Sequence, residues 1–327
     1  MNKNLIAIAI AAALAAPTMA SAEVKIIGQA QLELVNTTSD VRPEGISLDD
    51  ASEGGNVGSG NASALGVTGS HDLGNGLTGL YKINYNFHAD DNDDSLSARD
   101  RFIGLKGDFG TVLAGRINTP YKTSTVKWDP FLATFMQARG SNGMSGLHNG
   151  YANEVLAYAN TFGSVKFVGA VALDENDLDA DGELDGDHTI TFSVNVPVGP
   201  VELAVGYLDA TALDNGTAVK VGVKWKSGDL TVAGQFETLD EDLGDTSHVY
   251  VTASMAMGGG ATVAAAFGTV TDEGATDAKD GSYVSLGYKK AMSKKVSWHA
   301  GVVVVDEGVT GADQDATQIG AGVRVKF

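Results

Sequence analysis

The chain has 327 residues and no cysteine, and its 41 acidic against 22 basic residues give a net charge of −19 at pH 7. So acidic a chain repels a phosphate backbone, which argues against a nucleic-acid partner. The lack of cysteine excludes disulfides, thiol chemistry and cysteine-based metal sites.

Residues 1–22 have the pattern of a secretory signal peptide. Lys3 supplies a positive start, Leu5 to Ala16 is an unbroken apolar run, and Ala20-Ser21-Ala22 is a small-x-small cleavage motif. The alternative, a membrane-anchoring helix, needs about twenty apolar residues and no cleavage motif. We therefore expect cleavage after Ala22, export, and a single domain over residues 23–327.

After this segment no stretch reaches the roughly 18 consecutive apolar residues of a spanning helix. The chain alternates instead between apolar and polar residues. Residues 189–196 read Thr-Ile-Thr-Phe-Ser-Val-Asn-Val, and residues 318–327 place Gln, Gly, Arg and Lys opposite Ile, Ala, Val and Phe. This period of two predicts strands with one apolar face, although a single such strand would also fit a soluble β-sandwich.

The number and spacing of these segments favour a membrane barrel. Tight turns rich in Gly, Asp and Asn alternate with long polar loops along the chain. An even strand number, with short turns at one rim and long loops at the other, is typical of outer-membrane barrels, whereas a soluble sandwich has no reason to segregate its loops. The sixteen expected strands cover residues 24–36, 62–70, 77–88, 99–107, 110–116, 151–160, 164–174, 188–197, 199–211, 216–227, 229–239, 246–257, 260–272, 280–291, 295–306 and 315–327.

The fold class that follows is all-β, a transmembrane antiparallel barrel with short periplasmic turns and long extracellular loops. Sixteen strands enclose an aqueous channel. Lipid offers no partner to an unpaired backbone group, so the first and last strands must pair. Aromatic residues expected on the apolar face, where interfacial girdles form, are Tyr85, Phe87, Phe167, Phe192, Trp225, Phe236 and Tyr288.

Several motifs resemble those of the Gram-negative general porins. They are residues 24–30, residues 66–77, and residues 101–112 followed by Gly115-Arg116 and Asn118-Thr119-Pro120-Tyr121, together with the closing residues 320–327. The resemblance spans the mature chain and implies a homotrimer of sixteen-stranded barrels in the outer membrane. It also implies that the third loop, residues 117–150, folds inward to form a constriction in which acids face a ladder of wall arginines.

This chain departs from that pattern at the expected constriction. Ala64 and Ala157 stand where similar porins carry arginine, Arg116 is retained, and Asp129 is the one acid of the third loop. Lys220, with Glu33 and Glu237 as opposing acids, is also expected to face the lumen. The expected constriction and lumen residues are Arg116, Asp129, Lys82, Lys122, Lys127, Arg139, Ala64 and Ala157.

Most acidic residues fall in the expected long loops. Such a collar would attract cations within a Debye length, about 8 Å at physiological salt. It could also hold divalent ions that bridge to anionic lipopolysaccharide, or it could simply keep the loops soluble. With the arginine ladder thinned, a mild preference for cations is expected.

One acidic segment resembles a calcium loop. Residues 177–182 read Asp-Leu-Asp-Ala-Asp-Gly, with acids at loop positions one, three and five and glycine at six. Position twelve is His188 instead of a bidentate glutamate, and strands are expected on both sides. A solvated acidic loop fits these features better. The candidate Ca2+ ligands are Asp177, Asp179, Asp181 and Asp187, and no other cofactor is expected.

Nothing in the sequence predicts an enzyme. The six histidines share no metal-ligand spacing, and no Gly-x-Ser-x-Gly motif occurs. Asp108-Phe109-Gly110 copies a kinase tripeptide, but no phosphate-binding loop accompanies it and it fits a hairpin turn. The expected function is a passive, water-filled outer-membrane pore for ions and small hydrophilic solutes. The alternatives are a substrate-preferring channel or, from another class, an outer-membrane adhesin or enzyme.

Overall fold

The protein is described by a computed structural model. Residues 1–22 and much of the expected long loops lie outside its described part. Within that part no helix is long and apolar enough to cross a membrane. The described residues are 23–39, 44–49, 63–90, 96–138, 144–145, 147, 150–173, 188–210, 216–240, 245–272, 280–306 and 315–327.

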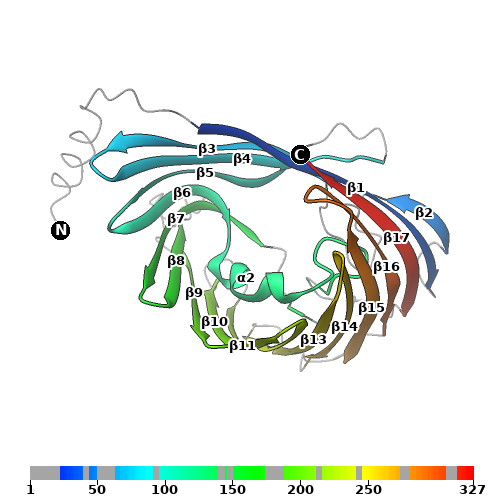
Figure 1. The fold of residues 1–327 in the computed structure, drawn as a ribbon. Coiled ribbons are helices and arrows are strands. Elements are labelled where there is room, and N and C mark those ends of the chain that lie inside the picture. Colours follow the sequence, from blue (N-terminus) through cyan, green and yellow to red (C-terminus); the bar gives the residue numbers. More distant parts are fainter. Residues whose placement is uncertain are drawn as a thin grey trace, which may run out of the picture.

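Antiparallel strands form one continuous wall (Figure 1). The expected strand positions are confirmed to within a few residues. The strands are β1 (Glu23–Ser39), β2 (Gly45–Asp49), β3 (Ala64–Gly74), β4 (Leu77–Asn86), β5 (Ser97–Gly107), β6 (Gly110–Asn118), β7 (Tyr151–Phe162), β8 (Val165–Leu173), β9 (His188–Val198), β10 (Val201–Asp209), β11 (Thr217–Ser227), β12 (Leu230–Asp240), β13 (Thr246–Gly258), β14 (Ala261–Asp272), β15 (Gly281–Ala291), β16 (Val296–Val305) and β17 (Ala316–Lys326).

The wall closes on itself through its first strand. Residues 23–29 of β1 pair with β3, and residues 29–39 pair with β17. The expected pairing of first and last strands is therefore confirmed. The short strand β2 pairs with residues 33–37 of β1. It lies between the first two expected strands, in a segment that was expected to be a loop. In the described part of the chain, the barrel wall thus has sixteen strands, β1 and β3–β17.

One expected turn is shorter than the sequence indicated. Residues 71–76 were expected as a turn, but β3 continues to Gly74 and only Asn75 and Gly76 reverse the chain. Their φ angles are 51° and 76°. Asn and Gly adopt this left-handed conformation at low cost, so two residues suffice to close the hairpin.

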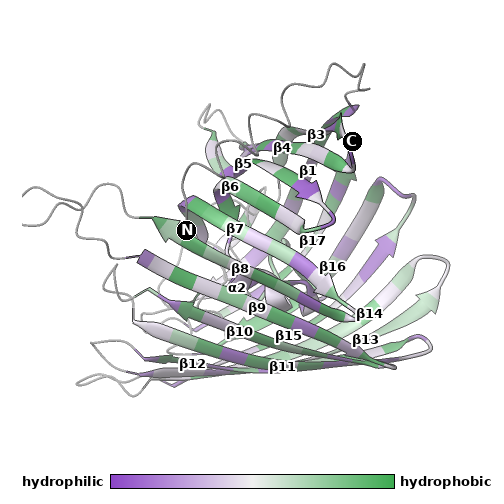
Figure 2. Ribbon diagram, turned by 90° about the vertical axis from the view of Figure 1, so that its left-hand side faces the viewer, coloured by the Kyte–Doolittle hydropathy of each residue, from purple (hydrophilic) through white to green (hydrophobic). Residues whose placement is uncertain are grey.

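The two faces of the wall differ as the alternating pattern predicts. On β1, Gln31 and Glu33 are buried inside the barrel, whereas Leu34 points outward and is 54% exposed. Figure 2 shows apolar and polar residues mixed along each strand, as this alternation requires. Trp225 and Phe236 are exposed on the outer face, where lipid contact favours aromatic and aliphatic side chains.

The segment between β6 and β7 folds into the barrel. We call its described residues, 119–138, 144, 145 and 147, the inner loop. It begins with helix α2 (Pro120–Thr125) and a single 3-10 turn, η1 (Val126–Trp128), and α2 lies inside the ring of strands (Figure 1). The Thr119 hydroxyl accepts a hydrogen bond from the Lys122 amide at 3.2 Å, and Pro120 opens the helix. Both features favour helix initiation here.

The hydrophobic core of the molecule lies between the inner loop and the wall. Phe131, Phe135 and Met136 of the loop are buried against Tyr283 and Val303 of the wall. Small wall residues make this close approach feasible. A Cβ added to Gly287 would lie 2.6 Å from the Phe131 ring, and one added to Gly222 would lie 2.5 Å from the Trp128 ring. One side of the barrel interior is therefore a packed core.

Candidate functional site: the pore constriction

The inner loop is fixed to the wall by a buried carboxylate on β12. Glu237 accepts hydrogen bonds from the Tyr121 hydroxyl at 2.7 Å and from the Ser145 hydroxyl at 2.5 Å. Tyr121 belongs to α2, whereas Ser145 belongs to the returning limb. Lys220, opposite Glu237 in the sheet, places its Nζ 3.9 Å from the centroid of the Tyr121 ring. Both limbs of the loop thus converge on one point of the wall.

Asp129 holds the inner loop together and does not face open water. Its carboxylate accepts hydrogen bonds from the amides of Phe131 and Ala138 at 2.8 and 3.0 Å and from the Tyr250 hydroxyl at 3.2 Å. Asp129 is only 3% exposed, and this burial raises its pKa. The expectation of an acid in the open constriction is corrected, because the loop amides and Tyr250 enclose this carboxylate.

Three further contacts come from the far side of the wall. Lys289 donates to the Pro130 carbonyl at 2.7 Å, and the Arg324 guanidinium donates to the Ala133 carbonyl. Glu33 accepts a hydrogen bond from the Phe135 amide at 3.2 Å and lies 2.5 Å from His299. The inner loop therefore covers β1 and β15–β17 as well as β12.

This arrangement changes the role expected for the wall acids. Glu33 and Glu237 do belong to the inner face, but both are fully buried beneath the loop. Lys220 is also fully buried. These charged groups hold the loop in place, and solutes in the open lumen do not meet them.

The inner face of β4 and β5 is more open and carries basic groups. Ile83 pairs with Arg101 and Tyr85 with Ala98, so a bulge in β5 sets two residues opposite Asn84. These two residues are Arg99 and Asp100. Arg99 donates to the side-chain Oδ1 of Asn86 at 2.7 Å, and Asp100 pairs with Lys82 at 2.6 Å. The bulge brings a guanidinium to the lumen that strict alternation does not predict.

Three positive groups gather around the ring of Tyr151, where the chain returns to the wall at the start of β7. The Nζ of Lys122 lies 4.4 Å from the ring centroid, and the guanidinium carbons of Arg116 and Arg99 lie 5.1 and 6.0 Å from it. The ring face attracts each cation and keeps the three together despite their mutual repulsion. We call Arg99, Arg116 and Lys122 around Tyr151 the basic cluster.

Arg116 reaches this cluster from the outer side of the wall. Its neighbour Ile117 is buried on the inner face, so Arg116 starts from the opposite face of β6. It donates to the Asn153 side chain at 2.6 Å and to the Ala98 carbonyl at 3.3 Å. Lys127 is exposed on η1. Arg139 lies outside the described residues.

The two alanines at expected arginine positions occupy different surroundings on the inner face. Ala64 pairs with Gln29 and Asn86 and lines a recess of about 290 Å³, into which Arg99 and Lys326 also project. Ala157 is 3% exposed and packs within an apolar group on β5–β8. Arg99 and Lys326 therefore supply positive charge beside Ala64, whereas the wall at Ala157 stays apolar.

The carboxylates of the described inner face are paired or covered. Asp100 pairs with Lys82, and Glu202 pairs with Lys224 at 2.5 Å. Glu33, Glu237 and Asp129 lie beneath or within the loop, as described above. Lys122 of the basic cluster is itself only 4% exposed, so Arg99 and Lys326 are the basic groups that reach the open wall beside Ala64. Arg99 was not expected on the inner face, and Lys326 was expected on the polar face of the last strand without being assigned to the constriction.

The described residues contain no group of three His, Asp or Glu side chains arranged to hold a metal ion. The calcium-like segment with Asp177, Asp179, Asp181 and Asp187 lies outside these residues.

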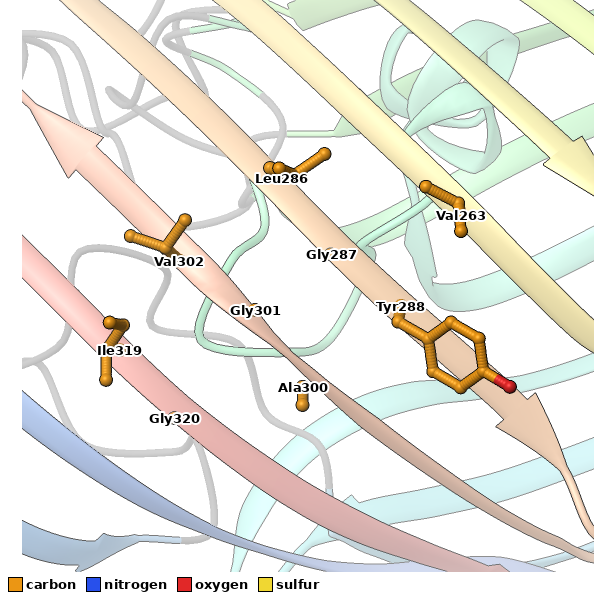
Figure 3. A pocket seen from close by; sticks show the side chains of 9 residues that line it. All are labelled: Val263, Leu286, Gly287, Tyr288, Ala300, Gly301, Val302, Ile319 and Gly320. Atoms are coloured by element: carbon orange, nitrogen blue, oxygen red, sulfur yellow. The ribbon is translucent and has the colours of Figure 1, made fainter.

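An apolar groove of about 590 Å³ lies on β14–β17, outside the lumen. Figure 3 shows Leu286, Val302 and Ile319 among the side chains around it, with Gly287, Gly301 and Gly320 between them. Leu286 is 53% exposed and belongs to the outward-facing row of β15. The groove therefore belongs to the outer face and is separate from the constriction.

Comparison with known families and proteins agrees with this architecture. The family model described as Gram-negative porin matches residues 7–310. An outer membrane porin protein of Bordetella pertussis is 27% identical over 259 residues, which cover 73% of this chain and 67% of that protein. Major outer membrane protein P.IB of Neisseria sicca is 33% identical over 133 residues, 40% of this chain. The match spans about a third of that relative, 35% of its length.

Solved structures share the fold at low identity. An anion-selective porin from Comamonas acidovorans has a TM-score of 0.75 and 20% identity, covering 94% of this chain and 100% of that chain. OmpT of Vibrio cholerae, in a trimer form, has a TM-score of 0.69 and 15% identity, with 94% and 100% covered. The closed barrel, the inward-folded loop and the match over residues 7–310 lead to one conclusion: the chain belongs to the Gram-negative porin family and is a β-barrel of the outer membrane.

Proposed function

We propose that the protein forms a passive, water-filled channel for ions and small hydrophilic solutes, and that its constriction favours anions. The observation that carries this proposal is the basic cluster. Arg99 and Lys122 meet at Tyr151 between the wall and the inner loop, and Arg99 is partly exposed on the inner face while Lys122 is 4% exposed. The Comamonas acidovorans structure, titled an anion-selective porin, shares the fold and is consistent with this sign.

The mild cation preference expected from the sequence is the competing hypothesis, and it has a different physical origin. It rests on the acidic loops at the mouth and on the absence of arginine at Ala64 and Ala157. Charges at the mouth are screened over about 8 Å at physiological salt, so they act weakly on an ion inside the constriction. Charges that line the narrow path act at closer range and in a lower effective dielectric. We therefore assign the larger effect to Arg99, the partly exposed wall member of the cluster, with a smaller contribution from the buried Lys122.

Reversal potentials across a planar bilayer under a KCl gradient test the sign. We expect the native channel to favour chloride and the Arg99→Gln, Lys122→Gln double variant to shift toward potassium. Lys290→Gln is the matched control, because Lys290 lies outside the lumen and donates to the Gly259 carbonyl at 2.7 Å. A native channel that favours potassium would contradict the anion proposal and support the effect of the loops.

We also propose that the protein assembles as a homotrimer. Family membership supports this, as does the trimer form of OmpT among the matching structures. Binding of lipopolysaccharide through divalent ions at the acidic loops is a further proposal that rests on the sequence alone.

A further inference from the structure

The wall below the basic cluster is apolar. Ile117, Val155 and Ala157 are buried together on the inner face of β6 and β7, and Phe102 and Leu113 pack against them. Sheet pairing places Leu113 opposite Ala157, and Ala157 opposite Ala170. We call these residues, Phe102, Leu113, Ile117, Val155, Ala157 and Ala170, the apolar patch.

The register shows that the patch faces the interior. Ala170 pairs with Thr191, and the Thr191 hydroxyl accepts a hydrogen bond from the amide of Tyr121 in the inner loop. On β5, Phe102 pairs with Lys82, which reaches Asp100 at the bulge. Phe102 and Leu113 remain half-buried, so part of their surface is open.

The patch adjoins the basic cluster. Tyr151 of the basic cluster is followed directly by Ala152, which pairs with Ile117. Ile117 therefore marks the end of the patch nearest the cluster. From Ile117 to Leu113 the chain advances about 13 Å along β6, at roughly 3.3 Å per residue. A ring or short alkyl chain fits within this length while a carboxylate stays at the cluster. Hydrated inorganic ions gain nothing from such a surface, because apolar contact with water is unfavourable.

We propose that the constriction preferentially passes small organic acids that carry an apolar group. The carboxylate would lie toward Arg99, and the apolar group would lie against the partly exposed Phe102 and Leu113. This inference rests on the proposed anion-favouring channel and adds the substrate class. The apolar contact is small and lies on one side of the solute. It therefore raises the permeability of these acids without binding them tightly enough to block the channel.

Benzoate and nicotinate form the decisive pair of probes. Both are planar monoanions of nearly equal size at pH 7.5, but the ring nitrogen makes nicotinate more polar. Bi-ionic reversal potentials against chloride give the permeability of each anion and exclude the neutral acid, which carries no current. We expect benzoate to be favoured over nicotinate by about threefold, as follows from a few tens of Å² of apolar contact.

Two leucine variants locate the effect. Leu113→Thr removes apolar surface from the patch and should bring the benzoate-to-nicotinate ratio close to one without changing the chloride-to-potassium ratio. Leu156→Thr makes the same change on the outer face of neighbouring β7, where Leu156 is exposed, and should leave both ratios unchanged. If Leu113→Thr does not yield channels, Leu113→Ala removes apolar surface from the patch without adding a polar group, and Leu156→Ala is its control on the outer face.

The outcomes separate this inference from the proposed function. Equal permeability of the two anions in a native channel that favours chloride over potassium would overturn the apolar patch and leave the anion preference intact. A ratio reduced equally by Leu113→Thr and Leu156→Thr would also overturn it. A native channel that favours potassium and passes neither anion selectively would overturn both proposals.

Discussion

The Tyr121 hydroxyl donates a 2.7 Å hydrogen bond to Glu237, a residue 116 positions later in the chain. Glu237 also accepts from Ser145, so both limbs of the inner loop depend on one wall carboxylate. Tyr121→Phe removes the hydroxyl and leaves the rest of the ring in place. We expect a loss of about 2 kcal/mol in local stability, typical of a buried hydrogen bond to a charged group, and noisier open-channel current.

Tyr207→Phe is a suitable control for that experiment. Tyr207 lies on the outer face of β10, away from the inner loop. Its hydroxyl contacts the Asp209 carboxylate at 3.4 Å. Its removal should change neither the open-channel noise nor the single-channel conductance. Equal noise in the two variants would show that the Tyr121 contact does not hold the loop.

Gly287 tests how closely the inner loop is seated. An added Cβ would lie 2.6 Å from the Phe131 ring and 2.8 Å from the Met136 sulfur, so Gly287→Ala should push the loop into the open lumen. Overpacking of this kind costs about 1–3 kcal/mol. We expect lower single-channel conductance. At Gly234 the nearest atom to an added Cβ is 3.4 Å away, and Gly234→Ala should conduct like the native channel.

Ala64 offers a direct test of charge at the open wall. Its recess also holds Arg99 and Lys326, so Ala64→Arg should strengthen the preference for anions and Ala64→Glu should weaken it. Ala64→Gln, which adds bulk without charge, controls for narrowing of the path. Ala157→Arg should act in the same direction as Ala64→Arg. Reversal potentials that follow side-chain size instead of charge would contradict this prediction.

The acidic segment from Asp177 to Asp187 remains open to a simple binding test. If it holds calcium, calcium should raise the melting temperature of the native protein, and Asp177→Ala with Asp181→Ala should abolish that shift. Magnesium in place of calcium controls for general screening of acidic loops. The same calcium shift in native and variant protein would identify the segment as a solvated loop.

Oligomeric state can be checked on protein extracted from membranes. We expect a β-rich circular dichroism spectrum and a slowly migrating oligomer on a gel that converts to monomer on boiling. A single monomeric band before boiling would leave the barrel intact and remove the proposed trimer.

The strands could be predicted from sequence because side-chain alternation is a local property. Each strand must show one face to lipid and the other to the interior, and no distant residue is needed to see this in residues 189–196 or 318–327. The short strand β2 was missed, since its five residues pair with β1 from within an expected polar loop.

The constriction could be predicted only in part. Alternation placed Glu33 and Glu237 on the inner face, but it could not show that the inner loop would cover them. Asp129 likewise holds the loop together instead of facing the lumen. Two of its partners are backbone amides, and a sequence pattern does not show which amides a carboxylate will contact. Arg99 was missed because a bulge in β5 interrupts the alternation and turns two successive residues inward.

The pairing of β1 with β17 has a consequence for biogenesis. The seam joins the segment that begins at Glu23 to the segment that ends at Lys326, so the ring needs its last eleven residues before it can close. A partly exported chain carries two unpaired strand edges and a wall that is apolar on one face. An unclosed sheet of this kind is prone to aggregation, and this state ends only when β17 pairs with β1.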